Sequence, residues 1–467
     1  MPSTAVVWFR RDLRVHDHPA LAAAAREHDR VLPLFVLDER LLHGRFESGP
    51  RTAFMLGALR ALDTELHVRG GALCVRHGRP ELVVAQLARE TGADAVYWTS
   101  DVSPFARRRD AAVTATLGEI GVAARPHGGN YCADVSVPRT KAGRPMTVFT
   151  PFWKAWELLE RRAVLAPPER LRLPDGLDPG ALPQGPRLDQ ALPAAFCAPG
   201  EAAARDALRA WLEGPVDRYA DRHDDLGGGT SGLSPHLRWG AISAREVEAR
   251  AGERGGAGAA AFIRQLAWRD FYAHVLLLHP ANARREFQER YRGLEWDDDD
   301  ELFSAWCEGR TGYPLVDAGM RQLAASGWMH NRARMVVGSF LTKNLHLDWR
   351  RGEWWFERML LDGEPAQNNG NWQWIASTGV DPAPYFRRIF NPVLQQQKFD
   401  PDGVYVRRWV PELAGVPVER LAEPWTMSPA QQAAACCVIG RDYPAPVVDH
   451  AIERRVALER YRAAGAG

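Results

Sequence analysis

The first 130 residues alternate short apolar runs with segments of helical periodicity. Five apolar runs read as buried strands: Ala5–Phe9, Val31–Leu37, Leu73–Val75, Ala95–Trp98 and Val122–Arg125. Helical patterns lie between them, near Pro19–Glu27, Arg51–Arg69, Pro80–Thr91 and Pro104–Leu117. Apolar strands that alternate with helices predict a doubly wound parallel sheet. We therefore expect an α/β domain over residues 1–130.

The pattern changes after this domain. Residues 131–200 are rich in proline and glycine and read as a long connector, with one short helix at Phe149–Arg162. From about residue 201 the strand signals end. Helical periodicity then runs through Ala260–Leu278, Tyr313–Ala325, His330–Leu341 and Trp354–Leu361. The acidic run Asp297–Glu301 reads as a solvated helix start. We expect an all-α domain over residues 201–467.

Composition narrows the function classes. The net charge is only +1, so a nucleic-acid site would have to be a local patch. No run approaches the 18 or so apolar residues that a membrane span requires. The six cysteines form no CxxC pair and have no zinc spacing with histidine, which predicts reduced thiols, a cytoplasmic location and no metal site.

Charged residues follow three of the predicted strands. Arg11, Asp38 and Asp101 fall at strand ends, where ligands of doubly wound sheets bind. No GxGxxG motif follows the first strand, so an ordinary dinucleotide site is not expected there. Helix capping and surface charge are the alternative interpretation of these residues.

A glycine- and hydroxyl-rich segment, residues 227–235, precedes a helical stretch. Backbone N–H groups and hydroxyls at a helix start can bind an anion such as a pyrophosphate. A flexible linker with a helix cap is the alternative interpretation.

The helical region concentrates tryptophan and polar side chains. Ten of the 17 tryptophans lie between Trp239 and Trp374. Gln265, Trp268 and Arg269 share one helix face by their spacing, and residues 327–335 and 361–374 again mix aromatic, amide and charged groups. A large aromatic core explains the tryptophans equally well. Buried polar groups need partners, however, and a heteroaromatic ligand would supply them.

Six motifs together resemble the photolyase/cryptochrome family. They are WFRRDLR, GTSGLSP, QLAWRDFY, TGYPLVDAGMRQL, GWMHNRARM and NNGNWQW, in that order, and the similarity runs from about Val6 to about Tyr443. The chain looks most like class I cyclobutane pyrimidine dimer photolyases of the 8-hydroxydeazaflavin subtype. That resemblance implies a carbon–carbon lyase that repairs UV-damaged DNA by electron transfer from excited, reduced FAD.

The resemblance also implies site residues. Those expected to hold FAD are Tyr219, Thr230, Ser231, Gly232, Leu233, Ser234, Arg269, Arg334, Asp362, Glu364 and Asn368. Asn368 would face the reactive edge of the flavin, and Arg334 would pair near Asp362. A tryptophan chain that photoreduces the flavin is expected in the order Trp372, Trp349, Trp306 from flavin to surface.

For DNA, the implied lesion pocket has aromatic walls at Trp268 and Trp374. Its other residues are Gln265, Asn331, Arg332 and Met335, with Gln395 on the DNA backbone. Related enzymes for (6-4) lesions carry histidines where Asn331 and Met335 stand, which favours the cyclobutane dimer. No obligate protein partner is expected, and a monomer suffices. The expected antenna residues are Arg11, Asp38, Asp101, Arg109 and Arg238, with 8-hydroxydeazaflavin favoured over methenyltetrahydrofolate.

The chain departs from the family pattern at four places, one of which is His223, where an arginine is usual. Gln265 stands where a glutamate is usual, and Glu364 where an aspartate is usual. The stretch DPAPYFRRIFNP (381–392) has one arginine more than usual. Gln265 cannot carry a negative charge, so the alternative function is a cryptochrome-type photoreceptor without repair turnover.

Overall fold

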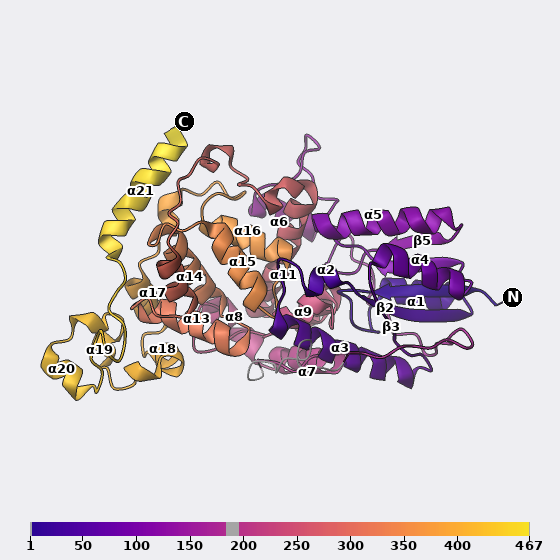
Figure 1. Cartoon of the computed structure of the whole chain (residues 1–467), viewed down its shortest axis with the longest axis horizontal. Helices are drawn as coiled ribbons and strands as arrows, with labels where there is room; N and C mark the ends of the chain where they lie inside the picture. The colour runs from indigo at the N-terminus through magenta and orange to yellow at the C-terminus, as the bar shows by residue number, and fades with distance from the viewer. Residues whose placement is uncertain (1, 184–195, 467) are drawn as a thin grey trace. The chain divides into compact units, whose positions relative to one another are not determined.

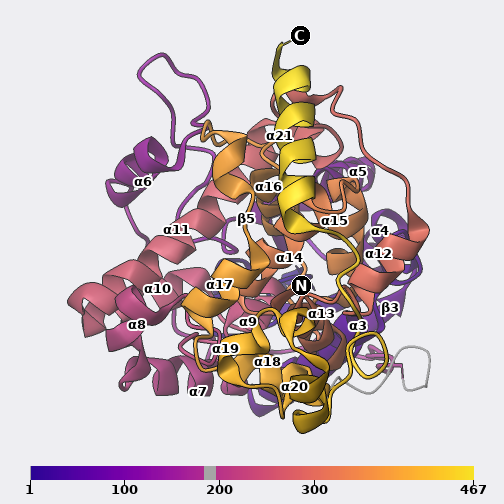
Figure 2. The ribbon, with the colours of Figure 1, turned by 90° about the vertical axis from the view of Figure 1, so that its left-hand side faces the viewer.

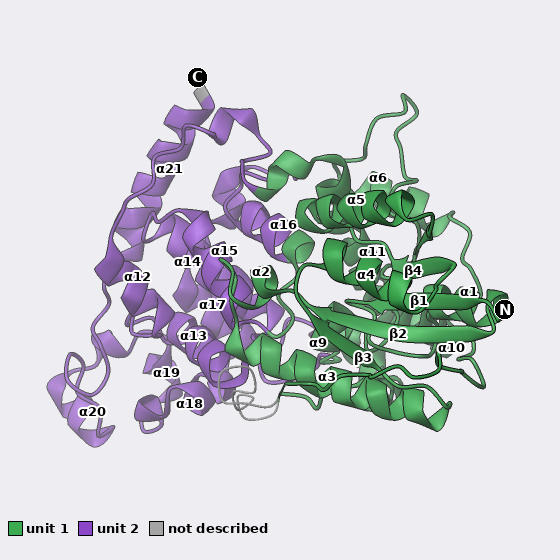
Figure 3. Ribbon diagram, turned by 45° about the vertical axis from the view of Figure 1, so that its right-hand side comes forward, with its two compact units in different colours: residues 1–220, 231–283, 361–367 green, residues 221–230, 284–360, 368–467 purple. Residues whose placement is uncertain are grey.

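The computed structural model describes residues 2–183 and 196–466. They form two compact units, which Figure 3 colours separately. Unit 1 comprises residues 1–220, 231–283 and 361–367, and unit 2 comprises residues 221–230, 284–360 and 368–467. The predicted domain boundaries at residues 130 and 200 stay a prediction, and residues 184–195 of the predicted connector lie outside the described residues.

Unit 1 contains a five-stranded parallel sheet in the order β3-β2-β1-β4-β5. The strands are β1 (Thr4–Phe9), β2 (Arg30–Leu37), β3 (Cys74–His77), β4 (Ala95–Thr99) and β5 (Ala123–His127). Each strand begins and ends within two residues of its predicted range, and the doubly wound sheet is confirmed. The chain builds outward from β1 in both directions, which places the topological switch point between β1 and β4.

Side-chain alternation explains why the central strand β1 is apolar on both of its faces. Ala5, Val7 and Phe9 of β1 belong to a core on one face of the sheet, whereas Val6 and Trp8 belong to a core on the other. Helices α1 (Pro19–Glu27) and α3 (Gly49–Val68) contribute to the first core, and α4 (Pro80–Glu90) and α5 (Pro104–Glu119) to the second (Figure 1). Because both faces are covered, no strand needs a polar side.

The predicted connector helix is shorter than expected. Helix α6 spans Phe149–Glu157 rather than extending to Arg162. After Glu157 the backbone continues with shorter i to i−3 hydrogen bonds, from the N–H of Leu158 to Ala155 and from the N–H of Leu159 to Trp156 (both 3.2 Å). Arg161 then donates to the carbonyl oxygen of Trp156 (3.0 Å) and to Glu248 (2.8 Å), which holds the chain beyond the helix.

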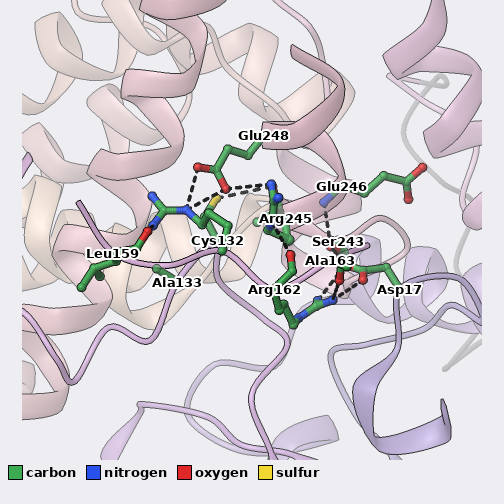
Figure 4. A network of polar contacts seen from close by, with 12 residues as sticks. Asp17, Cys132, Ala133, Leu159, Arg162, Ala163, Ser243, Arg245, Glu246 and Glu248 are labelled. Carbon is green, nitrogen blue, oxygen red and sulfur yellow. Dashed lines mark hydrogen bonds and ion pairs between the residues drawn. The ribbon is translucent and has the colours of Figure 1, made fainter. Parts of the chain in front are cut away.

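A buried polar network ties this part of the connector to the rest of unit 1 (Figure 4). Asp17 is fully buried and accepts from Arg162, Ser243 and the backbone N–H of Leu165. Burial alone would raise the pKa of Asp17, but these hydrogen bonds outweigh it and lower that pKa. Arg245 donates to the carbonyl oxygen of Arg162 (2.9 Å). The segment that follows α6 is thus pinned within unit 1.

The remaining helices of unit 1 present the motif residues. They are α7 (Glu201–Leu212), α8 (Tyr219–Arg222, ending in unit 2), α9 (Ser234–Trp239), α10 (Ala244–Arg254) and α11 (Gly256–Leu278). Helix α11 begins four residues before its predicted start and carries the Gln265–Tyr272 motif. The short α2 (Glu39–Leu42) follows β2 and is capped by Asp38, whose carboxylate accepts from the backbone N–H of Arg40 (3.1 Å).

Unit 2 is helical and packs around one large core. Its central helices are α12 (Asp300–Cys307), α13 (Pro314–Ser326), α14 (Asn331–Lys343), α15 (Trp349–Met359), α16 (Pro365–Ile375) and α17 (Pro392–Phe399). The others are α18 (Val404–Trp409), α19 (Val418–Leu421), α20 (Pro429–Ala434) and α21 (His450–Ala466), which are labelled in Figure 2. The core is rich in aromatic side chains, including Trp306, Trp349 and Trp372. The all-α fold expected here is confirmed.

Two helices of unit 2 begin directly after an aspartate that caps their first turn. Helix α15 begins five residues earlier than periodicity predicted, because Asp348 caps it by accepting from the N–H of Arg350. The acidic run begins a helix as predicted: Asp299 caps α12, and Asp300 and Glu301 lie in its first turn. Within residues 2–183 and 196–466, no helix is long and apolar enough to span a membrane.

Candidate functional site

The carboxyl ends of β1 and β4 carry a buried cluster of charges in unit 1. Arg11 follows β1 and Asp101 follows β4, and the Arg11 Nε lies 2.8 Å from Asp101. A second nitrogen of Arg11 lies 3.1 Å from Glu364, whose other oxygen lies 3.2 Å from Arg269. The hydroxyl of Tyr131 donates to Glu364 at 3.4 Å. The cluster therefore runs Asp101–Arg11–Glu364–Arg269 without interruption.

Electrostatics keep this cluster ionised. Burial would raise the pKa of Glu364, but the charges of Arg269 and Arg11 outweigh it and lower that pKa. The pKa of Asp101 is lowered in the same way, chiefly by Arg11 acting against burial. Burial and the charge of Glu364 raise the pKa of Tyr131, which stays protonated and able to donate.

The sequence had divided these residues between two sites. It assigned Arg11 and Asp101 to an antenna and Glu364 and Arg269 to FAD, yet the structure brings all four into one cluster. Both oxygens of Glu364 are engaged by arginines, so this side chain acts within the cluster. Tyr131 belongs to it and was missed, because a tyrosine in a connector carries no periodic signal.

The other expected antenna residues surround the same edge of the sheet. Arg109 stacks over Trp8 at 4.8 Å and over Phe105 at 5.8 Å, and Arg40, the partner of Asp38, stacks over Phe105 at 5.4 Å. Burial and the nearby charge of Arg10 lower the pKa of Arg109 to about 10. Burial disfavours the charged form of this guanidinium, and a bound anionic ligand would stabilise it.

The glycine-rich segment lies next to Asp362. The Ser231 hydroxyl accepts from the N–H of Leu233 (3.4 Å), and Gly232 adopts a left-handed φ of 64° that a side chain would strain. Ser234 donates to Asp362 at 2.6 Å, and Arg238 donates to the carbonyl oxygen of Gly363. Hydroxyls and backbone N–H groups beside a buried carboxylate suit a ligand that has both a pyrophosphate and N–H donors. This donor set fits FAD.

The other expected FAD residues lie around these groups or in unit 2. Tyr219 packs edge-on against Trp211 (5.5 Å) and Phe262 (5.6 Å) in unit 1. In unit 2, Arg334 donates to the carbonyl oxygen of Met329 (2.8 Å), and Asn368 is buried. The amide of Asn368 donates to Glu357 (3.2 Å) and to the carbonyl oxygen of Glu353 (2.9 Å), which fixes its orientation. Thr230 is the last residue of the stretch 221–230 that belongs to unit 2.

All three expected electron-transfer tryptophans are buried in the core of unit 2. The rings of Trp372 and Trp306 lie 6.2 Å apart, and the N–H of Trp306 donates to the carbonyl oxygen of Val337. Trp349 donates to Glu286 at 3.2 Å. The N–H of Trp372 is buried and makes no hydrogen bond within the described residues.

The outer end of the expected tryptophan chain is buried. Trp306 has no exposed surface, which does not match the surface position expected for it, and the order Trp372, Trp349, Trp306 stays a prediction. Its helix packs that face into the core, which helical spacing alone did not reveal. Partly buried tryptophans on the same core include Trp296 and Trp355, and sequence reasoning missed both.

The expected lesion residues are divided between the units. In unit 1, Gln265 is exposed on α11, and Trp268 stacks on Phe149 with ring centroids 3.6 Å apart and planes 9° apart. In unit 2, the Asn331 amide lies 3.8 Å from the sulfur of Met335, and Arg332 pairs with Asp224 (2.5 Å) while stacking on Phe399.

The remaining lesion residues of unit 2 follow α14 in the sequence. Trp374 donates from its indole N–H to Asp381 (2.9 Å), and Gln395 lies half-buried on α17. Sequence reasoning missed the supporting residues Phe149 and Asp381. Asp381 begins the stretch 381–392, but that pattern does not indicate its contact with Trp374.

Comparison with known proteins extends over nearly the whole chain. Residues 5–171 match the family model of DNA photolyase, and residues 262–463 match the model described as the FAD binding domain of DNA photolyase. The deoxyribodipyrimidine photo-lyase of Streptomyces griseus is 44% identical over 98% of this chain and 99% of its own. That of Halobacterium salinarum is 41% identical over 98% of each.

The chain belongs to the DNA photolyase family. Among solved structures, it superposes on a class III photolyase from Agrobacterium tumefaciens with a TM-score of 0.94, at 37% identity over 100% of this chain and 98% of that one. It superposes on a cryptochrome from Synechocystis sp. PCC6803 with a TM-score of 0.92, at 30% identity over 98% and 99%. The chain thus carries the family's FAD-binding domain.

Proposed function

We propose that this protein is a deoxyribodipyrimidine photo-lyase, which repairs cyclobutane pyrimidine dimers in DNA under blue light. The observation that carries the proposal is the similarity to photo-lyases over almost every residue, at up to 44% identity among those named above. The aromatic residues expected to wall the lesion are present on both units. Extruding a damaged dinucleotide costs less than extruding a normal one, because the lesion already weakens its own stacking and pairing.

The residues proposed to hold FAD are Tyr219, Thr230–Ser234, Arg269, Arg334, Asp362, Glu364 and Asn368. The chemistry that bound, reduced FAD supplies is a light-excited electron that is lent to the lesion and returned. Ser231 and the N–H groups of its turn would bind the pyrophosphate, and Asp362 would accept from an N–H group. Glu364 contributes through Arg269 and Arg11, by holding the segment that carries Asp362.

The residues proposed to contact DNA are Gln265, Trp268, Asn331, Arg332, Met335, Trp374 and Gln395. Base stacking on the two indoles would supply most of the lesion affinity. With a net charge of +1, binding depends on local arginines, and affinity should fall as salt rises. Trp372, Trp349 and Trp306 remain proposed for flavin photoreduction, with a partly exposed tryptophan completing the route.

We further propose that the edge of the sheet binds an antenna chromophore, with 8-hydroxydeazaflavin favoured. The residues are Arg11, Asp38, Asp101, Arg109 and Arg238. The lowered pKa of Arg109 beside Arg10 supports a ligand that is anionic. Reconstitution with the deazaflavin and with methenyltetrahydrofolate, followed by absorbance scans, tests this assignment. Retention of folate alone would overturn it, and with it the proposed 8-hydroxydeazaflavin subtype.

A second candidate function is photoreception without repair. The fold matches a cryptochrome at a TM-score of 0.92, and Gln265 replaces the glutamate usual in repair enzymes. The test is anaerobic: the flavin is photoreduced, oligothymidine carrying cyclobutane dimers is added, and the thymine absorbance is followed in light and darkness. Light-dependent recovery supports repair, and a flat trace with reduced flavin bound overturns it.

Three proposals concern organisation. We expect domains at 1–130 and 201–467 joined by a connector at 131–200, a monomer, and a cytoplasmic location. The six free cysteines are consistent with a reducing compartment. Sedimentation of the protein with and without dimer-containing DNA tests the monomer.

A further inference from the structure

Trp374 of unit 2 is held by contacts at the edge of its indole ring and over one face of the ring. It is partly exposed at the C-terminal end of α16. Its indole N–H donates to the Oδ2 of Asp381 at 2.9 Å, and the guanidinium carbon of Arg388 lies 4.2 Å from the centre of its ring. Arg388 and Asp381 are themselves paired at 2.7 Å, through the same Oδ2. One ion pair therefore fixes both the rotation and the plane of the indole.

Arg388 is well suited to hold a ring in place, because it is itself immobilised. Its side chain is 3% exposed, and it also donates to the carbonyl oxygen of Trp374 (2.9 Å). Its own carbonyl oxygen accepts from the Ser339 hydroxyl (2.8 Å) and from the ammonium of Lys343 (3.0 Å). Lys343 is fully buried and donates in addition to the carbonyl oxygen of Ile375 (2.6 Å). The arginine is thus anchored at both its backbone and its side chain.

The two adjacent arginines of this loop, Arg387 and Arg388, lie in different environments. Arg387 is exposed, whereas Arg388 is buried and carries the contacts with Trp374. Arg387 therefore adds charge at the surface, whereas Arg388 holds the indole.

We propose that Asp381 and Arg388 are positioning residues for Trp374, which orient the indole so that its uncovered face stacks on a base of the lesion. The inference rests on the proposed function, because it takes Trp374 as a wall of the lesion pocket. An indole free to rotate would lose orientational freedom on binding, and preorganisation removes that loss. A planar guanidinium can cover one face of the ring, which a lysine ammonium does less well.

The test is a double-mutant cycle on the full-length protein with FAD bound. Asp381→Ala, Trp374→Phe and the double variant are compared for dissociation constants toward a duplex with one thymine dimer. Phenylalanine keeps an aromatic face but has no N–H for Asp381 to hold. Glu412→Ala is the matched control, since it removes an acid from unit 2 that pairs with Arg321 instead (2.6 Å). FAD content and the flavin spectrum report on folding.

Asp381→Ala should weaken binding about tenfold when Trp374 is present, because part of one base-stacking interaction is lost. The same change should cost about twofold or less in the Trp374→Phe background. The repair rate with saturating DNA and light should stay unchanged, so the effect appears in affinity alone. Arg388→Lys should also weaken binding of the dimer duplex, although it keeps the positive charge, because an ammonium covers the ring face less well.

Other outcomes separate the possible failures. Equal losses in both backgrounds, or a loss no larger than that of Glu412→Ala, would overturn the positioning role. A loss that is accompanied by lost FAD would assign Asp381 to folding and would also overturn it. If the wild-type protein did not prefer the dimer duplex over undamaged DNA, the proposed function itself would fail.

Discussion

Replacing Glu364 by glutamine tests the charge cluster of unit 1. The Glu364 side chain is 4% exposed and pairs with Arg11 (3.1 Å) and Arg269 (3.2 Å), which are 13% and 10% exposed. Removing one partner of a buried ion pair costs about 3–5 kcal/mol of unfolding free energy, because the other charge stays buried without compensation. Arg11 keeps Asp101 at 2.8 Å, and the glutamine oxygen can still accept one hydrogen bond. We therefore expect Glu364→Gln to lower the unfolding free energy by about 3 kcal/mol, the lower end of that range.

The assay is urea unfolding of the FAD-loaded protein at neutral pH, followed by circular dichroism. Glu412→Gln is the control, because its ion pair with Arg321 is about one-quarter exposed and should contribute about 0–1 kcal/mol. Glu364→Asp keeps the charge but has a shorter side chain. Its loss of unfolding free energy should therefore lie between those of Glu364→Gln and Glu412→Gln. If Glu364→Gln lost no more than Glu412→Gln, the reasoning from burial would be refuted.

Three further outcomes follow from the contacts described above. Folding lowers the pKa of Glu364. Its contribution to the unfolding free energy is therefore present above its unfolded pKa of 4.5 and is lost as pH falls through the folded pKa. The difference in unfolding free energy between wild type and Glu364→Gln should therefore shrink below pH 4.5, and a constant difference would contradict this. Gly352→Ala should cost about 1–3 kcal/mol by the same urea assay, since its Cβ would lie 2.1 Å from the Trp372 ring. Gly293→Ala, with nothing within 4 Å, is the control, and equal losses would argue against overpacking. Phe149→Leu removes the flat contact with Trp268 and should weaken dimer binding several-fold, whereas exposed Leu158→Ala should leave the dissociation constant unchanged.

The sequence determined the architecture, because local patterns report which faces are buried. Fully apolar strands between helices require a sheet covered on both sides, and β1 divides its residues between two cores as that pattern demands. Some helix boundaries were missed because they depend on single contacts. Asp348 begins α15 five residues early through a capping hydrogen bond that periodicity does not encode.

Only the tertiary structure decided which polar groups meet. Arg11, Asp101, Arg269 and Glu364 come from four separate segments, and no spacing links them before the chain folds. Burial is equally nonlocal: the family resemblance implied a surface position for Trp306, yet packing leaves it no exposed area. The grip of Asp381 and Arg388 on Trp374 also depends on a loop whose composition shows only an additional arginine. A sequence records which side chains are available, whereas their distances and burial arise from packing between remote segments.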